Sequence, residues 1–341
     1  MSKFINKIKG FFQKHMLFYY AMSMAASWAW GTSLIVGMQI VQDRGILPFI
    51  IWAAANSLSL PLFGYIAFKI PKLNDIMKSK PVMLFTTAVQ CFCLWIQMNA
   101  IYEILINHNI VGDLAAKLIA IAIAVVFLFG LFKNGLMRNV STDQPIWAIC
   151  YIGMVAIAII GFVCGNGFQS VPFVNSGEDI NWALYTCIVL FSGPLMDIQN
   201  WQLARKVYAE KRMKSYYLAG ILFAIYMVLV AVLAFLNFNR AMDIIMVLVI
   251  ICVATSTINN AIVGVQEIAG RKVGFVIGAV CIAAWQIVIP LGVMGLWLTM
   301  GTARIYVSIA CIATGIVWNY IEKRKKRKEQ VTGGQDGDDK K

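Results

Sequence analysis

Charged residues are scarce in this chain. They make up 13% of its 341 residues, about half of the roughly 25% that is usual in soluble domains. Hydrophobic residues make up 60%, and the mean hydropathy is +0.74. A soluble globule could not cover its surface with so little charge, and a disordered chain is never so apolar. The composition excludes an ordinary soluble enzyme and a disulfide-stapled secreted module, and it indicates a polytopic helical membrane protein.

Metal-binding and thiol motifs are also missing. The two histidines, His15 and His108, stand apart from any cysteine or carboxylate cluster with ligand spacing, which argues against a zinc site. The eight cysteines include no CxxC pair and lie in or beside apolar stretches, so we interpret them as small packing residues. No Ser/His, His/Asp or metal constellation falls at membrane depth, and we therefore expect no enzymatic activity.

Long apolar stretches are present instead. A helix needs about 20 mostly apolar residues to cross a bilayer, and these stretches are apolar on all sides, unlike transmembrane strands, which alternate every second residue. The first is too long for a cleaved signal peptide and leads directly into the second. We predict ten transmembrane helices, at 17–41, 46–68, 82–105, 114–132, 145–164, 182–204, 215–237, 243–268, 273–297 and 302–321.

Basic residues alternate between the two sides of these ten spans. The N-terminal arm, the even-numbered connections and the tail contain nearly all of the 29 lysines and arginines. By the positive-inside rule, these segments and both termini are cytoplasmic, and the protein belongs to an inner or plasma membrane. On the opposite side we place Arg44, Lys117, Arg240 and Arg304. This assignment leaves no basic side chain at mid-membrane depth, so an anionic solute would depend on helix N-termini and a cation.

The spans divide the chain into five parts. We predict a basic cytoplasmic arm (1–16), a first five-helix repeat (17–164), an extracytoplasmic loop (165–181), a second five-helix repeat (182–321) and a basic, then disordered, cytoplasmic tail (322–341). The basic run in the tail is interpreted as a positive-inside anchor beside anionic lipid rather than a nucleic-acid site. The expected partners are the lipid bilayer and a small-molecule solute, with no nucleic acid, and the oligomeric state is left open.

Two of the spans are interrupted, and each opens a set of five. Span one contains the small and polar run Ser23–Ser33, and span six contains the run Phe191–Asp197. Interrupted segments at matching positions are typical of inverted-repeat transporters with a binding site at the midplane. We expect Pro194 to begin a new half-helix, with Ser192 or Gly193 as its cap. The alternative is a kink that binds nothing.

The backbone groups freed at the ends of the half-helices are the expected binding groups. A half-helix N-terminus offers partial positive charge, and the free carbonyls of the preceding half can coordinate a cation. In span one, the run Gly31–Ser33 would cap the outer half. Asp197 is the most deeply placed acid, and we expect it to orient the second half-helix, to bind a cation or to carry a proton.

Span eight contains a dense polar stretch in an apolar helix, with Ser256 and Thr257 at its centre. Hydroxyl oxygens carry no charge, so they suit a weakly held monovalent ion that must also leave. The alternative is that these hydroxyls bond back to their own helix or join two helices.

Three stretches give the chain a resemblance to the sodium:solute symporter family of the APC superfamily, whose LeuT-type fold is a five-plus-five inverted repeat. They are Ser23-x-x-Ala26-Ser27-x-x-x-Gly31 in the first helix, Asp197-Ile198-Gln199-Asn200-Trp201-Gln202-Leu203-Ala204 in the sixth, and Val253-x-x-Ser256-Thr257 in the eighth. The resemblance implies a coupling Na⁺ ion held by the carbonyls of Ala26, Ala29 and Val253 and the hydroxyls of Ser256 and Thr257.

The same resemblance implies a solute site between the two breaks, with contributions from helices two, three and ten. The solute contacts predicted there are Trp30, Gly31, Asn56, Gln90, Ser192, Gly193 and Asp197. The alternative for the polar residues of spans two and three, which include Gln97 and Asn99, is to join helices. For Trp28 and Trp30 the alternative is packing.

These observations predict a secondary active transporter that couples a small polar organic solute to Na⁺. Spans one, two, six and seven would rock against the rest, and differential affinity for the two orientations would couple the gradients. Two alternatives remain: a non-transporting membrane sensor or scaffold that retains the fold, and a proton-coupled transporter that uses Asp197. The chain departs from the family in having no room for its peripheral helices and in carrying Leu203 in place of an arginine.

Overall fold

The computed structural model describes residues 16–131, 135–165, 167–206 and 209–333, and nearly all of them are helical. The first half contains α2 (Met16–Trp28), α3 (Gly31–Gln39), the π-helical η1 (Ile40–Arg44), α4 (Ile46–Lys69), α5 (Leu73–Ile76), α6 (Lys80–Asn107), α7 (Asp113–Leu131) and α8 (Gly135–Cys164). The second half contains α9 (Gly177–Met196), α10 (Ile198–Lys206), α11 (Ala209–Ala234), α12 (Arg240–Ala269), α13 (Arg271–Val288), the 3₁₀ turn η2 (Ile289–Leu291) and α14 (Gly292–Gly333). The predicted arm (1–16), apart from its last residue, and the end of the predicted tail (334–341) lie outside the described residues.

Six stretches among the described residues are long and apolar enough to cross a membrane, or seven if the bent pair of α2 with α3 counts as one span. One of the six is the combined stretch of α13, η2 and α14. The all-α class is therefore confirmed, and the apolar helices fit a multi-pass membrane protein. The number of ten crossings and the inverted repeat remain predictions.

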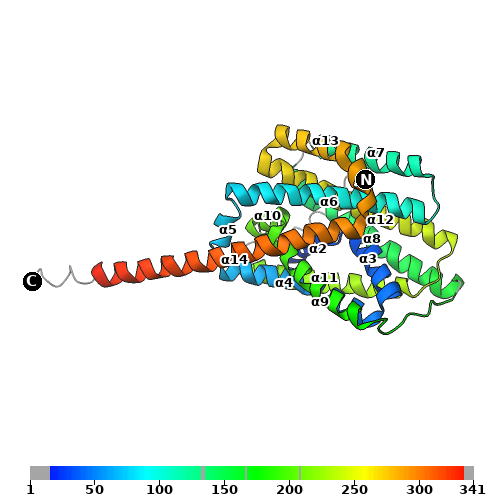
Figure 1. The fold of residues 1–341 in the computed structure, drawn as a ribbon, viewed down its shortest axis with the longest axis horizontal. Coiled ribbons are helices and arrows are strands. Elements are labelled where there is room, and N and C mark those ends of the chain that lie inside the picture. Colours follow the sequence, from blue (N-terminus) through cyan, green and yellow to red (C-terminus); the bar gives the residue numbers. More distant parts are fainter. Residues whose placement is uncertain (1–15, 132–134, 166, 207–208, 334–341) are drawn as a thin grey trace, which may run out of the picture.

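The helices form two groups that pack mainly within themselves (Figure 1). In the first group, α4 packs on α9 and α11, and α11 also packs on α2. In the second group, α6 packs on α12, and both contact α7 and α13. Two helices join the groups, because α8 packs on α12 and α2, and α14 packs on α6 and α9. The broken segment of α2 and α3 lies between the groups, which is where a site shared by both can form.

Connections that the sequence assigns to one side of the membrane meet at one end of the bundle. The N–H of Ile46 donates to the carbonyl of Pro172 (3.1 Å), and the His108 ring lies 2.6 Å from the Asp243 carboxylate. Gly45 has φ +103°, and a Cβ there would lie 2.7 Å from the Pro172 carbonyl oxygen, so this turn requires glycine.

An ion pair fixes the same end of the bundle. Arg44, the last residue of η1, lies 2.5 Å from Asp179 in the first turn of α9 and stacks on Trp182 at 4.3 Å. The Ser176 hydroxyl, which caps α9, and the Arg44 guanidinium lower the pKa of Asp179. The carboxylate therefore stays charged and holds η1 against the start of α9.

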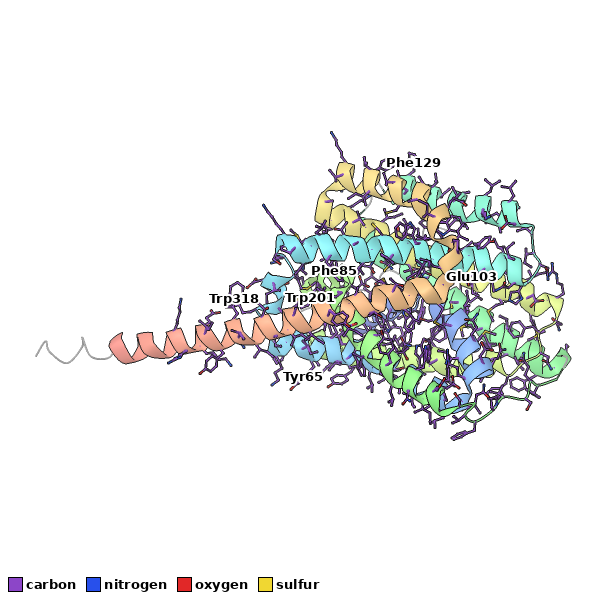
Figure 2. The ribbon with its side chains drawn as sticks, in the orientation of Figure 1. Tyr65, Phe85, Glu103, Phe129, Trp201 and Trp318 are labelled. Carbon is purple, nitrogen blue, oxygen red and sulfur yellow. The ribbon has the colours of Figure 1, made fainter. Side chains whose placement is uncertain are left out.

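The second connection and the tail meet at the opposite end, and so do α10 and the end of α12. Lys72, just before α5, lies 2.8 Å from Glu322 on α14 and over the ring of Trp318 at 5.4 Å. Gln202 of α10 donates to Glu267 near the end of α12. Figure 2 places Trp318 where α14 extends beyond the bundle, beside α5. These contacts therefore lie at the end of the bundle opposite Gly45 and Asp179.

The first predicted interruption is confirmed. The segments Leu17–Trp28 and Gly31–Arg44 meet at a bend of 60°, and Trp30 between them is extended (φ −77°, ψ 153°). The cap of α3 differs from the prediction, because no side chain of the run Gly31–Ser33 supplies it. Instead Gln97, on α6, accepts the Gly31 N–H at 3.0 Å.

The second interruption lies three residues later than predicted. α9 continues through Pro194 to Met196, and the chain breaks at Asp197 (φ −96°, ψ 110°). Asp197 caps α10, since its carboxylate accepts the Gln199 N–H (3.2 Å). The carbonyls left at the end of α9 are bonded by side chains beyond the break: Asn200 donates to Pro194 (3.4 Å) and Trp201 to Leu195 (2.8 Å). Pro194 therefore does not begin a half-helix, and neither Ser192 nor Gly193 is a cap.

The boundary between the last two predicted spans is also corrected. The predicted boundary lies between 297 and 302, but the chain turns at η2, where Pro290 removes an N–H donor and Gly292 has φ +63°. Glu103 on α6 accepts the Val293 N–H at 2.8 Å and so caps α14 (Figure 2). The last helix therefore begins ten residues earlier than predicted, which moves its polar residues deeper into the bundle.

Candidate functional site

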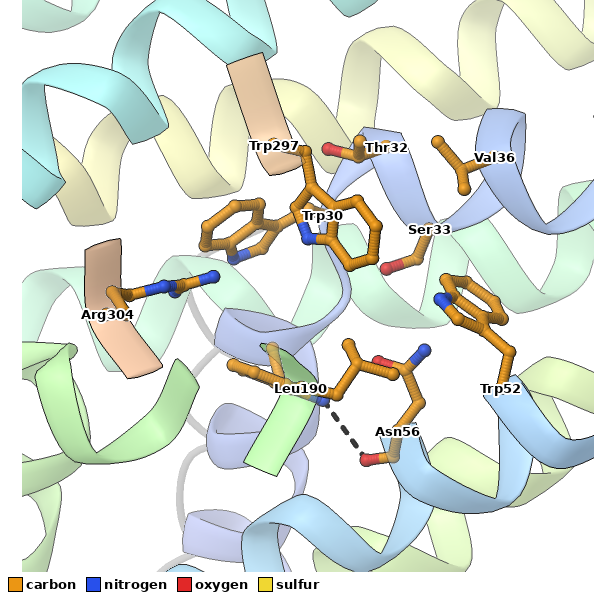
Figure 3. A pocket seen from close by; sticks show the side chains of 10 residues that line it. Trp30, Thr32, Ser33, Val36, Trp52, Asn56, Leu190, Trp297 and Arg304 are labelled. Carbon is orange, nitrogen blue, oxygen red and sulfur yellow. Dashed lines mark hydrogen bonds between the residues drawn. The ribbon is translucent and has the colours of Figure 1, made fainter. Parts of the chain in front are cut away.

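A small pocket lies at the break between α2 and α3, where α4, α9 and α14 also reach it. Its cavity volume is about 20 Å³, enough for about one or two water molecules. Four tryptophans form most of its wall, and Figure 3 shows Trp30, Trp52 and Trp297 around it. The lining residues are Trp28, Trp30, Thr32, Ser33, Val36, Trp52, Asn56, Leu190, Trp297 and Arg304.

The wall formed by Trp28 is fixed from two sides. The Trp28 indole donates to the backbone carbonyl of Asn56 on α4 (3.2 Å; dashed line in Figure 3). Gly193 on α9 packs against the ring so closely that a Cβ there would lie 2.4 Å from it. Glycine is therefore required at 193 by the approach of Trp28, and not by a turn, since α9 is helical at this residue.

Arg304 corrects the expectation that no basic side chain is found at depth. It lies well inside α14, about 18 Å from its start at 1.5 Å per residue, and only 1% of its surface is exposed. Its guanidinium points across the pocket toward Trp30 (Figure 3) and lies 5.7 Å from the centre of that ring. The prediction was wrong because it began the last span at 302, which placed Arg304 at a helix end.

The carbonyls predicted to hold sodium lose their helical partners at the break. In a continuous helix the Ala26 carbonyl would accept the Trp30 N–H and the Ala29 carbonyl the Ser33 N–H. Here the Trp30 N–H bonds Trp28 (3.1 Å) and the Ser33 N–H bonds Trp30 (2.8 Å). Both carbonyls are thus released from the helical ladder, which is the condition for coordinating a cation.

The other predicted sodium ligands lie on α12. Val253, Ser256 and Thr257 are each 2% exposed, and α12 contacts both α2 and α3. α12 approaches the break at Ala254, whose Cβ lies 3.4 Å from where a Cβ on Gly31 would be. The Thr257 hydroxyl bonds back to the Val253 carbonyl at 3.4 Å, which is the alternative weighed for it. The helix that carries the hydroxyls therefore passes directly behind the first break.

Asp197 belongs to a second polar cluster. Gln90 on α6 donates to its carboxylate (3.2 Å), and the Gln199 side chain donates to Gln90 (3.4 Å). All three residues are buried. The N-cap geometry fits the first role considered for Asp197, that of orienting the second half-helix. Gln90 and Asp197 do not line the pocket at Trp30.

The predicted solute contacts therefore do not all belong to one site. Trp30 and Asn56 line the pocket, Gly31 forms the start of α3 beside it, and Gly193 supports its Trp28 wall. Ser192 lies behind the pocket, where its hydroxyl bonds Val189 (2.7 Å) and its carbonyl accepts from Ser308 (3.3 Å).

Sequence reasoning missed several lining residues, chiefly Trp52, Leu190, Trp297 and Arg304. Trp297 and Arg304 could have been found from the sequence Ile289-Pro290-Leu291-Gly292. Proline followed by glycine marks a helix boundary, and with the boundary there both residues fall inside a span.

No protein-family model matches the chain, and no curated protein matches it.

Proposed function

We propose that this chain is a secondary active transporter with ten crossings in a LeuT-type five-plus-five inverted repeat, coupled to Na⁺. In this numbering, α2 with α3 is the first crossing and α9 with α10 is the sixth. The observation that carries the proposal is the pair of breaks, at Ala29–Trp30 and at Asp197, because each interrupts the first crossing of a set of five.

The helix packing supports an internal repeat. If each crossing is exchanged with the one five places away, most of the principal helix contacts exchange with one another. The contact of α2 with α11 becomes that of α9 with α4, and the contact of α8 with α12 becomes that of α14 with α6. The contact of α6 with α7 likewise becomes that of α12 with α13. The short half-helices depart from this pattern, since α3 packs on α11 while the main contacts among the described residues include none between α10 and α4.

The two groups of helices support alternating access. The first, second, sixth and seventh crossings pack on one another, and so do the third, fourth, eighth and ninth. A transporter can rock one such group against the other as a rigid body around a site at their boundary. The pocket at Trp30 is lined by α2, α3, α4 and α9 of the first group and by α14, which packs on both groups.

The ion site supports sodium in particular. The carbonyls of Ala26 and Ala29 are released from the helical ladder, and the hydroxyls of Ser256 and Thr257 on α12 would add neutral oxygens. Neutral oxygen ligands hold a monovalent cation weakly enough for release. Sodium bound there would join α2 to α12, which belong to different groups, and so favour one orientation of the two.

The proposal is tested by uptake into proteoliposomes. Purified protein is first screened by thermal shift against acetate, pyruvate, glycine and glucose, in sodium and in potassium. Labelled forms of the solutes that stabilise it are then offered with and without an inward sodium gradient. We expect uptake only with the gradient, and equal uptake under both conditions would reject sodium coupling.

The role of the two hydroxyls in the proposed sodium site can be tested against a matched control variant in the same helix. Ser256→Ala combined with Thr257→Ala should abolish sodium-driven uptake and sodium-dependent stabilisation together. Thr255→Ala removes the neighbouring hydroxyl, which is bonded only to Cys252 on its own helix (2.7 Å), and should leave both intact. Solute binding without any flux would instead support the sensor or scaffold alternative. Uptake driven by a pH gradient without sodium, and lost in Asp197→Asn, would support the proton-coupled one.

A further inference from the structure

Arg304 is a buried cation with two N–H-bearing atoms that lack an acceptor among the described residues. Its Nε and Nη1 atoms have no partner among the described residues, and no described carboxylate lies within ion-pair distance of its guanidinium. A charge in a membrane-spanning bundle is costly, and it is normally paired or placed where a ligand binds. The Trp30 ring offers a cation–π contact at 5.7 Å, which satisfies the face of the guanidinium but none of its N–H groups.

The other unpartnered polar atoms of the pocket are also hydrogen-bond donors. Trp52 Nε1 and Asn56 Nδ2 also lack an acceptor among the described residues, and both side chains are 2% exposed. With Arg304 they make four unpartnered donor atoms around one cavity. An indole N–H and a guanidinium can only donate, and no acidic side chain lines the pocket. What is missing from this wall is a group that accepts several hydrogen bonds and carries negative charge.

The size and shape of the pocket narrow the choice of anionic group further. The pocket in this state admits a group of a few atoms and no more. A carboxylate is small and planar, and its two oxygens match the two adjacent N–H groups of a guanidinium. The tryptophans suit a flat group and the short carbon chain attached to it.

We propose, resting on the transport function above, that the solute is a small carboxylate whose anionic group binds Arg304, with Trp52 and Asn56 as further donors. Arg304 comes from the tenth crossing, Trp52 and Asn56 from the second, and Trp30 from the first. The anion site is therefore formed by three separate crossings, two from the first group of helices and the third α14, which joins the groups. The carboxylate neutralises Arg304 within the bundle, so the site is charged when empty and neutral when filled.

Asp197 is the competing partner for Arg304. Its charge acts on Arg304 through the bundle, but its carboxylate is bonded to the Gln199 N–H and to Gln90. If the two residues formed a structural pair, the anion would be supplied by the protein itself. The experiment must therefore include variants of both residues.

The test is binding to the purified full-length protein in detergent, in HEPES buffer containing sodium and free of chloride. The probes are acetate, propionate and benzoate, each matched with its neutral amide, and chloride at equal ionic strength. Thermal melting and intrinsic tryptophan fluorescence report on the pocket, because four tryptophans line it. We expect saturable stabilisation by at least one carboxylate and none by its amide.

The variants decide which residue is responsible. Arg304→Gln should weaken the carboxylate response by about tenfold or more, the loss expected for about 1.4 kcal/mol. Arg304→Lys keeps the charge and so guards against misfolding, and it should bind more weakly than the wild type because an ammonium cannot make the paired contact. Arg240→Gln removes an arginine far from the pocket and should change nothing. Asp197→Asn should keep the carboxylate response.

Three results would overturn the proposal. Equal responses to carboxylates and amides would remove the need for a charge. Stabilisation by chloride alone would assign the site to an inorganic anion. No carboxylate response in the wild type, with Asp197→Asn and Arg304→Gln equally destabilised, would make Arg304 and Asp197 a structural pair. Carboxylate binding without sodium-driven flux would support the carboxylate site and reject transport. Sodium-driven uptake of neutral solutes alone would support transport and reject the carboxylate site.

Discussion

At the scale of single residues, three polar side chains of α6 bond groups at or beside the chain breaks. Gln97 caps α3, Gln90 bonds the carboxylate of Asp197, and Asn99 accepts the Trp285 indole N–H at 2.7 Å and contacts η2 through Ile289 (3.5 Å). Each could be recognised from sequence as a polar residue at depth. Which backbone group it would meet could not, because that depends on the register between α6 and helices far along the chain.

For Arg304, the residue type was clear from the sequence, but its position in the bundle was predicted wrongly. A charged residue is the easiest feature to read in an apolar sequence, yet its depth depends on where its helix begins. Hydropathy is nearly uniform from Arg271 onward, and the combined stretch to Lys325 even passes as one apolar segment. An error of ten residues at η2 therefore moved Arg304 from the pocket to the surface in the prediction.

Gly193 offers a prediction at residue scale. A Cβ at this position would lie 2.4 Å from Trp28, so Gly193→Ala must displace the indole and break its bond to Asn56. We expect a loss of about 1–3 kcal/mol in unfolding free energy, as for overpacking in other cores, together with weaker solute binding. Denaturation in mixed micelles and the fluorescence assay measure the two effects.

Gly177→Ala is the matched control for that change. Gly177 lies in the same helix, and a Cβ there would meet nothing within 4 Å. It should leave both stability and binding unchanged. If the two variants behave alike, the close packing of Gly193 on Trp28 is not what fixes the pocket wall.

At the scale of elements, the breaks at Trp30, at Asp197 and at η2 differ in how clearly the sequence marks them. The first is marked by a run of small residues, and it was predicted correctly. The second contains a proline, but the chain breaks at Asp197 instead, because an acidic N-cap and the side chains of Asn200 and Trp201 satisfy the groups exposed there. Proline inside a helix costs one hydrogen bond, whereas a break must satisfy several groups at once. Local sequence shows the first effect and not the second.

The cap of α3 gives a prediction at element scale. Gln97→Ala leaves the Gly31 N–H without its acceptor in a buried place, and we expect a cost of about 1–3 kcal/mol. The bend between α2 and α3 should loosen, which is measured as faster hydrogen exchange over residues 29–33. Thr87→Ala on the same helix is the control, because its hydroxyl bonds only Met83 of α6 (2.9 Å). Unchanged exchange in Gln97→Ala would show that the break holds without its partner helix.

At the scale of the whole molecule, composition was sufficient for the all-helical class, while the ten crossings inferred from basic-residue alternation stay a prediction. Neither composition nor this alternation could supply the packing, because nearly every helix is apolar on all sides and so no face is marked as interior. The exchange of helix contacts between crossings five places apart is a property of the packing alone. It is therefore an independent argument for the repeat, beside the paired breaks that the sequence already indicated.

The topology follows from the same alternation and can be tested with a native residue. Cys164 is exposed at the end of α8, at the same end of the bundle as Gly45 and His108, while Lys78 is exposed at the opposite end, beside α5. In sealed right-side-out vesicles we expect a membrane-impermeant maleimide to label Cys164. A cysteine introduced by Lys78→Cys, on a Cys164→Ser background, should react only after the membrane is opened. Because an added or missing crossing anywhere between residues 78 and 164 would place both thiols on one side, labelling of both from outside would reject the ten-crossing arrangement, and with it the matching of the two breaks.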